Sequence, residues 1–147
     1  MKRTYLIFFI FLLSSFELMA SEIVCDFNID KMYEAKSGKF NKGKIYSDEK
    51  NYKIKITNIT KISDKTFSGT LNGANHIDRD VKMVSKERVV SISQSDANNP
   101  DYFAHYTIFA NQKTANGDYL SSMYEVYPSN WGFGAVYYYR GSCKIIK

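Results

Sequence analysis

The sequence predicts an all-β protein, a single small antiparallel β-barrel or β-sandwich of about eight strands in a meander. Three observations predict it. Runs of alternating apolar and polar residues recur along the chain, short turn signals such as Asn-Gly separate them, and no amphipathic helix of ordinary length occurs. A meander of this size closes into a barrel or folds into two packed sheets, and both alternatives stay open.

The first 20 residues have the three parts of a secretory signal peptide that is removed. Lys2 and Arg3 form a basic start, an apolar run follows from Tyr5 to Phe16, and the small residue Ala20 ends the segment. That run is shorter than the ~20 residues that a membrane-spanning helix needs, and no later stretch is longer. We therefore expect a single β-domain at residues 21–147, periplasmic or secreted, with no transmembrane segment after signal removal.

The charge of the mature domain is mildly basic. Removal of residues 1–20 leaves 18 basic and 14 acidic residues, a net charge of +4. The lysines are scattered, whereas a nucleic-acid-binding surface is densely basic, so no nucleic-acid partner is expected. The frequent use of lysine, isoleucine and asparagine is typical of an AT-rich bacterial genome. We expect a monomer.

In the first half of the mature chain, period-two patterns predict strands at 23–27, 52–57 and 66–71. Tyr52, Ile54 and Ile56 alternate with polar residues, which indicates one buried and one solvated face. Gly69 suggests a bulge or bend. Residues 31–35 fit a helical turn or a strand. Two segments are predicted to be connections by composition: 37–44 and 72–80, the second opening with Asn-Gly.

In the second half, the chain again alternates between strands and turns. A hairpin is predicted from residues 81–84 and 88–93, followed by a polar loop at 94–100. The longest apolar strand is 102–110, and an Asn-Gly turn within 111–118 leads to a strand at 119–127. In that strand Met123, Glu125 and Tyr127 share one face. A turn at 128–132 precedes the closing strand, which ends at Cys143.

The chain has two cysteines, Cys25 in the first predicted strand and Cys143 in the last. With an export signal in front of them they belong in an oxidising compartment, where a pair of this kind forms a disulfide. Two isolated cysteines without histidine neighbours do not form a zinc site. The disulfide would join the first and last strands, as an up-and-down barrel requires.

Catalytic signatures are absent from the sequence, and no enzyme activity or cofactor is expected. No G-x-S-x-G or H-E-x-x-H motif occurs. Of the two histidines, His105 lies inside a strand and is interpreted as a polar residue on its wetter face. His76, Asp78 and Asp80 are weak candidates for metal binding on a turn, but their spacing fits no established metal loop, so no metal site is predicted.

Aromatic residues are the more informative feature, with 12 tyrosines in the chain. Tyrosine gives a large contact area at low entropic cost, which suits a binding surface, although it is also a good strand residue. The candidate binding surface consists of Trp131, Phe133, Tyr137 and Tyr139, near the end of the chain.

Three functions are compatible with these features. The first is a non-catalytic protein-binding module, similar in format to an inhibitor, whose partner is an unknown protein. The second is a lipocalin-like carrier of a small apolar ligand, for which about 127 residues is short; Trp131 also lies far from the first strand, where that family has its tryptophan. The third is a structural envelope-associated protein. The small size leaves little room for an interior ligand and favours the protein binder.

Overall fold

The computed structural model describes residues 20–36, 39–45, 51–73, 76–96, 99–127 and 134–147. These residues form an all-β structure, as predicted. The strands are β1 (Glu22–Lys36), β2 (Lys39–Lys42), β3 (Asn51–Ser63), β4 (Thr66–Gly73), β5 (His76–Ser85), β6 (Val89–Asp96), β7 (Asn99–Lys113), β8 (Tyr119–Tyr127) and β9 (Gly134–Ile146). Within the same ranges, no helix is long and apolar enough to cross a membrane.

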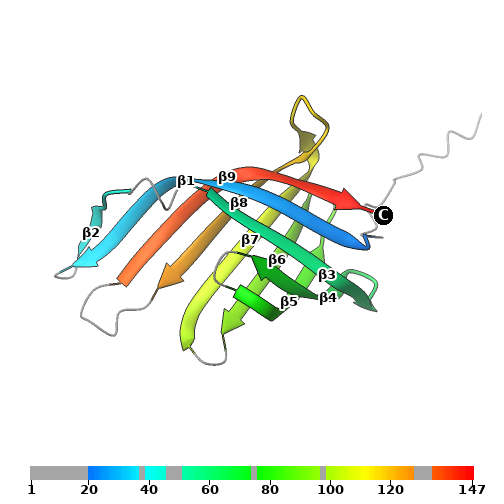
Figure 1. Cartoon of the computed structure of the whole chain (residues 1–147), viewed down its shortest axis with the longest axis horizontal. Coiled ribbons are helices and arrows are strands. Elements are labelled where there is room, and N and C mark those ends of the chain that lie inside the picture. The colour runs from blue at the N-terminus through cyan, green and yellow to red at the C-terminus, as the bar shows by residue number, and fades with distance from the viewer. Residues whose placement is uncertain (1–19, 37–38, 46–50, 74–75, 97–98, 128–133) are drawn as a thin grey trace, which may run out of the picture.

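Eight of the strands close into an antiparallel barrel. Each strand from β3 to β9 pairs with its neighbour in the chain, β3 pairs with β1, and β9 returns to pair with β1 along 13 residue pairs. Figure 1 shows the first and last strands, in blue and red, side by side. The short β2 pairs only with the far half of β1. Of the two predicted architectures, the barrel is therefore the observed one.

The predicted disulfide between Cys25 and Cys143 is confirmed. The two cysteines lie opposite each other in the β1–β9 register, so the covalent link and the closing strand pair coincide. Both side chains are buried in the barrel. A disulfide is consistent with a location outside the cytoplasm.

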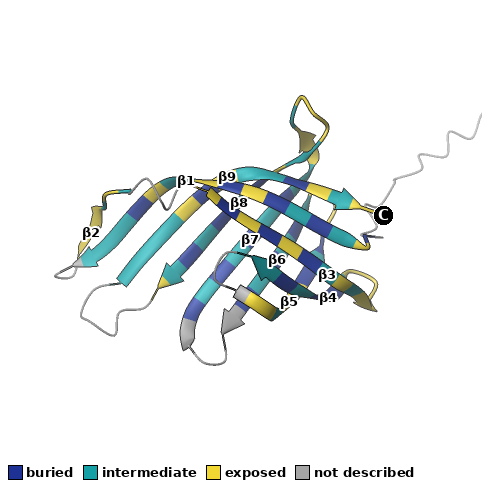
Figure 2. Ribbon diagram, viewed as in Figure 1, coloured by how far each residue is buried: buried dark blue, intermediate teal, exposed yellow. Residues whose placement is uncertain are grey.

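Alternating burial along the strands defines the inside and the outside of the barrel (Figure 2). In β3, Tyr52, Ile54 and Ile56 are buried, whereas Lys53 and Lys55 between them are exposed. This is the pattern that the sequence predicted for these residues. Since successive side chains of a strand point to opposite faces, the alternation distinguishes the interior from the outer wall wherever it is regular, as in the first half of β3, in β4 and in β8.

Several segments that were predicted as connections, or left undecided, are extended strand. Residues 31–35 continue β1. The register with β9 shifts between Ile29 and Lys31, and the pairing then continues to Ala35 and Gly134. Strands also occupy part of two predicted connections, 37–44 and 94–100. The predicted connection at 72–80 is wrong over most of its length, since β4 continues to Gly73 and β5 begins at His76.

Gly69 lies at an irregularity of the β3–β4 pairing, as predicted. Thr57 pairs with Thr70 and Thr60 with Ser68, so the register shifts opposite Gly69, whereas its pairing with Val81 of β5 is regular. A Cβ atom on Gly69 would lie 2.9 Å from Cγ2 of Ile56. Glycine at this position therefore allows the neighbouring side chains to pack closely inside the barrel.

Candidate binding site

The barrel interior is filled by large side chains. Large apolar residues that are at most 2% exposed come from strands all around the barrel, and they include Ile23, Phe27, Ile54, Ile56, Leu71, Met83, Ile92, Tyr106, Ile108 and Met123. Small barrels of eight strands have interiors just wide enough for their own side chains. The apolar part of this interior is therefore a packed core.

A polar cluster is embedded in this interior around Glu125 of β8. Its side chain has no exposed surface, and its carboxylate accepts hydrogen bonds from the hydroxyls of Tyr102 at 2.8 Å and Tyr139 at 2.9 Å. The hydroxyl of Tyr127 lies 3.5 Å from the second carboxylate oxygen. A buried carboxylate is strongly destabilising unless hydrogen bonds satisfy it, and these hydroxyls supply them.

The same cluster keeps the surrounding tyrosines in their neutral form. Burial, and after it the negative charge of Glu125, raises the pKa of Tyr102, Tyr106 and Tyr139 above the ordinary value of 10.0. Burial also raises the pKa of Tyr52, whose ring centroid lies 5.6 Å from that of Tyr139. The raised pKa favours the protonated phenol, and the hydroxyls of Tyr102, Tyr106 and Tyr139 donate hydrogen bonds.

Gln94 of β6 connects this interior to an opening in the wall. Its side-chain oxygen accepts a hydrogen bond from the Tyr106 hydroxyl at 2.9 Å. Only 1% of the residue is exposed, and its amide nitrogen has no hydrogen-bond partner among the described residues. A buried donor without an acceptor costs about 1–3 kcal/mol, so this nitrogen is a natural contact for a ligand.

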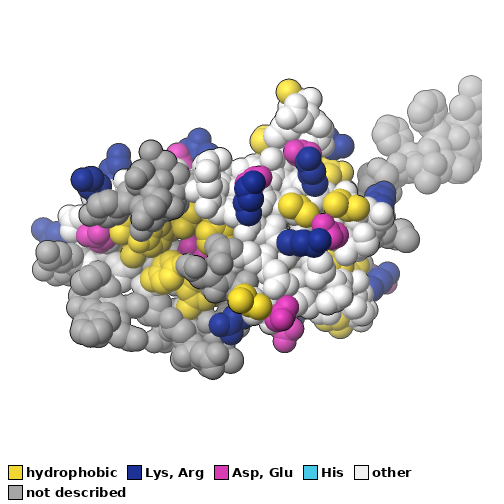
Figure 3. Space-filling model, viewed as in Figure 1, with side chains coloured by type: hydrophobic (Ala, Val, Ile, Leu, Met, Phe, Trp, Pro, Cys, Tyr) yellow, Lys and Arg dark blue, Asp and Glu magenta, His cyan; other side chains and the backbone are white. Residues whose placement is uncertain are grey.

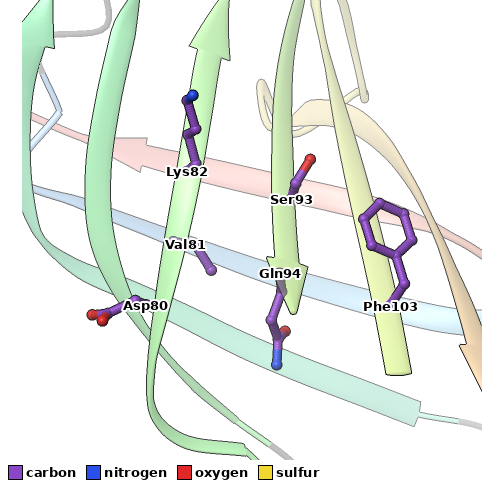
Figure 4. A pocket seen from close by; sticks show the side chains of 6 residues that line it. All are labelled: Asp80, Val81, Lys82, Ser93, Gln94 and Phe103. Carbon is purple, nitrogen blue, oxygen red and sulfur yellow. The ribbon is translucent and has the colours of Figure 1, made fainter. Parts of the chain in front are cut away.

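The opening lies beside Val81 and Gln94, which form the last β5–β6 pair of the register within the described residues. A pocket of about 310 Å³ lies at this point. Figure 4 shows its lining residues on three neighbouring strands: Asp80, Val81, Lys82, Ser93, Gln94 and Phe103. We call this pocket the β5–β6 seam.

On the outer wall next to the seam, five aromatic side chains form a continuous outer aromatic ladder. Its members are Tyr33 of β1, Phe103 and His105 of β7, Tyr124 of β8 and Tyr138 of β9. Successive ring centroids are close: 5.4 Å between His105 and Tyr124, 6.4 Å between Tyr124 and Tyr138, and 6.0 Å between Tyr138 and Tyr33. Phe103 also lies 5.9 Å from Tyr124. Phe103 belongs both to the ladder and to the lining of the seam.

The strand register explains why these aromatics meet. His105 is paired with Tyr124, and Tyr124 with Tyr138, so their outward side chains form one row across the wall. The row next to it contains Phe103, Val126, Val136 and Tyr33. On the other side lies a polar row of Thr107, Ser122, Arg140 and Asn28. Aromatic and apolar residues bordered by polar ones resemble the anatomy of a protein–protein interface.

Charged side chains do not gather into a single basic patch on the visible face. Figure 3 shows lysine and arginine side chains scattered over it, with acidic side chains between them. Near the ladder, Arg140 forms an ion pair with Asp30 at 2.9 Å. The outer wall around the ladder therefore offers a partner mainly aromatic rings and not a cluster of like charges.

His105 is the only titratable imidazole whose side chain the structure describes. It is half-buried in the ladder, and its Nδ1 atom lies 3.3 Å from the Ser93 hydroxyl. Burial lowers the pKa of His105 from the ordinary value of 6.5. The ladder therefore presents a neutral ring at neutral pH, stacked against Tyr124 at an interplanar angle of 30°.

The structure places the predicted surface aromatics in different environments. Trp131 and Phe133 lie outside the described residues. Tyr139 is buried in the interior, hydrogen-bonded to Glu125, and Tyr137 lies on the same inner face with its ring centroid 6.4 Å from that of Tyr139. The outward-facing aromatic between them is Tyr138, which is 44% exposed.

The weak metal candidates do not come together as a site in the described part of the chain. Asp78 and Asp80 are exposed on β5, and the side chain of His76 is not described. No group of three histidine, cysteine, aspartate or glutamate residues in the described ranges is arranged to hold a metal ion.

Sequence reasoning missed Gln94, Phe103, Tyr124 and Tyr138 as candidate site residues. Phe103, Tyr124 and Tyr138 lie in predicted strands, whereas Gln94 is the first residue of the predicted loop at 94–100, and none has a local motif. Their signal depends on cross-strand register: the outward residues of β7, β8 and β9 become adjacent only when the strands are paired. An alignment of the predicted hairpins could have revealed the His105–Tyr124–Tyr138 row.

Comparisons with known proteins give no match: no protein-family model, no curated protein and no solved structure matches this chain.

Proposed function

We propose that this chain is an exported, non-catalytic protein-binding module that acts in the periplasm or as a secreted protein. Its partner is a protein that docks on the outer aromatic ladder. The observation that carries the proposal is the ladder itself, a contiguous row of outward rings across β7, β8, β9 and β1.

The composition of the ladder favours a protein partner. Tyrosine and other aromatics are enriched in the cores of protein interfaces, where a few of them contribute most of the binding energy. The ladder contains three tyrosines, and Val126 and Val136 lie between its rings. Tyr138 is exposed, and the other rings and the two valines are half-buried. A contiguous, partly accessible apolar patch of this kind is typical of a surface that a partner covers.

The filled interior favours surface binding over the carriage of a small apolar ligand. A carrier needs an inner apolar face that large side chains leave free. Here Phe27, Met83, Tyr106 and Met123 occupy the centre of the barrel and are each at most 2% exposed. The polar end of the interior is occupied by Glu125 and its tyrosine partners.

The proposal can be tested by comparative capture. The mature protein, prepared in an oxidising compartment, is immobilised as the wild type, as Tyr138→Ser and as the matched control Ile62→Ser. Ile62 is an exposed apolar residue, 63% accessible, at the far end of β3. Each form is incubated with an envelope extract, and the captured proteins are quantified by mass spectrometry.

We expect one protein to be captured in near-stoichiometric amount by the wild type and by Ile62→Ser. Tyr138→Ser should weaken its binding about tenfold, the effect of losing one interface residue worth about 1.4 kcal/mol. Equal capture of the same protein by Tyr138→Ser and the wild type would exclude the ladder as the docking surface.

A further inference from the structure

One unbroken row of outward side chains crosses six strands and contains three rings of the outer aromatic ladder. Each member is paired in the strand register with the next. In the order β5, β6, β7, β8, β9 and β1, the members are Lys82, Ser93, His105, Tyr124, Tyr138 and Lys31. Figure 4 shows the end at Lys82 and Ser93, on adjacent strands. We call this the lysine-ended row, because its first and last members are lysines.

Both lysines project from the same outer wall as the rings. Lys82 is exposed beside the buried Val81, and Lys31 is exposed beside the buried Met32. Since successive side chains of a strand alternate between its faces, both lysines lie outside the barrel. In the part of the chain that the structure describes, the ion pairs of other basic residues include neither Lys31 nor Lys82.

The acidic residues next to these lysines are not bonded to them. Asp30 precedes Lys31, but its carboxylate is paired with the guanidinium of Arg140 at 2.9 Å. Asp80 is exposed two residues before Lys82, on the same face of β5. Two residues of a strand span about 6.6 Å, so a carboxylate that approaches along the row contacts Lys82 and avoids Asp80.

The row has the layout of a protein interface, in which an apolar centre is surrounded by a polar rim. Its centre is the ladder, and its two ends are charged. The lysines are five strand spacings apart, about 24 Å along the wall, and a standard interface patch of about 800 Å² on each partner is wide enough to include both. The two lysines therefore mark opposite edges of one docking surface.

We propose that the partner protein has an acidic rim that matches this row: one aspartate or glutamate pairs with Lys31, another pairs with Lys82, and an apolar centre covers the rings between them. This inference rests on the proposed function, since it describes the face of the protein that docks on the ladder. Docking removes water from both ammonium groups, and a carboxylate opposite each of them compensates for that loss.

The spacing of the charges favours separate carboxylates on a protein over a polyanion. A nucleic acid carries negative charges at short, regular intervals and needs a densely basic surface. Between its two lysines the row offers only three rings and the hydroxyl of Ser93, and Val126 and Val136 lie beside the rings. The charges of a polyanion would remain unpaired over this centre.

The test measures the binding kinetics of the protein that the wild type captures from the envelope extract. It is measured against the wild type, the row variant Lys31→Gln/Lys82→Gln and the matched control Lys86→Gln/Lys144→Gln. The control changes the net charge by the same amount, at two exposed lysines outside the row. Association and dissociation rates are recorded at about 0.05 M and about 0.5 M salt, where the screening of exposed charges differs strongly.

We expect the row variant to lower the association rate about fivefold at the lower salt concentration and to leave the dissociation rate nearly unchanged, because rim charges act mainly on the encounter of two proteins. The difference should disappear at the higher salt concentration. The control should associate like the wild type. Equal association rates for the row variant and the control would overturn the inference.

Carbodiimide cross-linking gives a second measurement that needs no variant, because it joins a carboxylate directly to an amine. In the complex of the wild type, Lys31 and Lys82 should be linked to aspartate or glutamate residues of the captured protein. Links that involve only lysines outside the row would contradict the proposed contacts.

Failure of this inference can be separated from failure of the proposed function. A captured protein whose binding is weakened by Tyr138→Ser, but whose association rate is the same for the row variant and the control, would support docking on the ladder and exclude the acidic rim. A partner that is insensitive to Tyr138→Ser would overturn the proposed function, and this inference with it.

Discussion

The hydroxyl of Tyr139 donates a hydrogen bond of 2.9 Å to the carboxylate of Glu125 inside the barrel. The two residues lie on adjacent strands, β9 and β8, and both side chains are buried. Tyr102 of β7 donates to the same carboxylate at 2.8 Å. The carboxylate of Glu125 therefore links three consecutive strands, β7, β8 and β9, by hydrogen bonds inside the barrel. The outer surface of these strands carries most of the ladder.

Substitution of Glu125 should destabilise the barrel in a graded manner. Glu125→Gln keeps the shape and one acceptor oxygen but loses the charge, and we expect a loss of about 1.5–3 kcal/mol in the free energy of unfolding. Glu125→Leu leaves the hydroxyls of Tyr102 and Tyr139 without an acceptor and should cost about 3–5 kcal/mol. Urea unfolding measures both, with Glu87→Gln on the exposed turn as the control. A Glu125→Leu variant as stable as the wild type would contradict the role assigned to this carboxylate.

Alkaline titration should reveal tyrosines that ionise only when the barrel unfolds. Burial raises the pKa of Tyr52, Tyr102, Tyr106 and Tyr139 above 10.0, so in these four the folded state favours the neutral phenol. Their contribution to stability is complete below the unfolded-state pKa of about 10 and is lost as the pH rises above it. We expect tyrosinate absorbance to appear in two phases, the later one coinciding with loss of the β-sheet circular dichroism signal. A single phase completed while the barrel is still folded would refute this expectation.

The stability of the barrel should depend on His105 at mildly acidic pH. Burial lowers the pKa of this imidazole below 6.5, so its protonation favours the unfolded chain. The stabilisation is present above the unfolded-state pKa and is lost as the pH falls through the folded-state pKa. Between about pH 7.5 and about pH 5, the urea midpoint of the wild type should fall more than that of His105→Gln. Parallel pH profiles for the two proteins would show that His105 does not titrate in this way.

Reduction of the disulfide should remove a large part of the stability. Cys25 and Cys143 are separated by 118 residues, and in the chain-entropy model a link across such a loop contributes about 5 kcal/mol. Single domains have total stabilities of about 5–15 kcal/mol. Reductant should therefore lower the urea midpoint of the wild type strongly, but leave that of Cys25→Ala/Cys143→Ala unchanged. An unchanged wild-type midpoint under reducing conditions would contradict this prediction.

Most strands and the disulfide could be predicted from the sequence. Strands leave a local pattern of alternating residues, and the chain has only two cysteines to pair. The strand from Tyr119 to Tyr127 has the predicted bounds, since its alternation is clear and an Asn-Gly turn precedes it. The alternation also placed Met123, Glu125 and Tyr127 on one face. The alternation did not show that this face points into the barrel. When one face of a strand carries a glutamate as well as aromatic residues, the sequence alone does not indicate which face is buried.

The features that depend on pairing could not be predicted. Barrel and sandwich stayed open because closure is decided by the pairing of β1 with β9, far apart in the chain. Residues 76–80 look like a turn because aspartate is unfavourable in strands. Their pairing with β4 and the contact from Asp78 to Asn72 override that preference. The outer aromatic ladder likewise arises from four strands brought into register, and the seam from three.

The most direct measurement is carbene footprinting of the complex with the captured partner, compared with the free protein. The account predicts that labelling falls at Phe103, Tyr124 and Tyr138, while the exposed Ile62 on β3 is labelled equally in both states. Unchanged labelling of the ladder, together with protection elsewhere on the barrel, would show that the partner docks on a different surface.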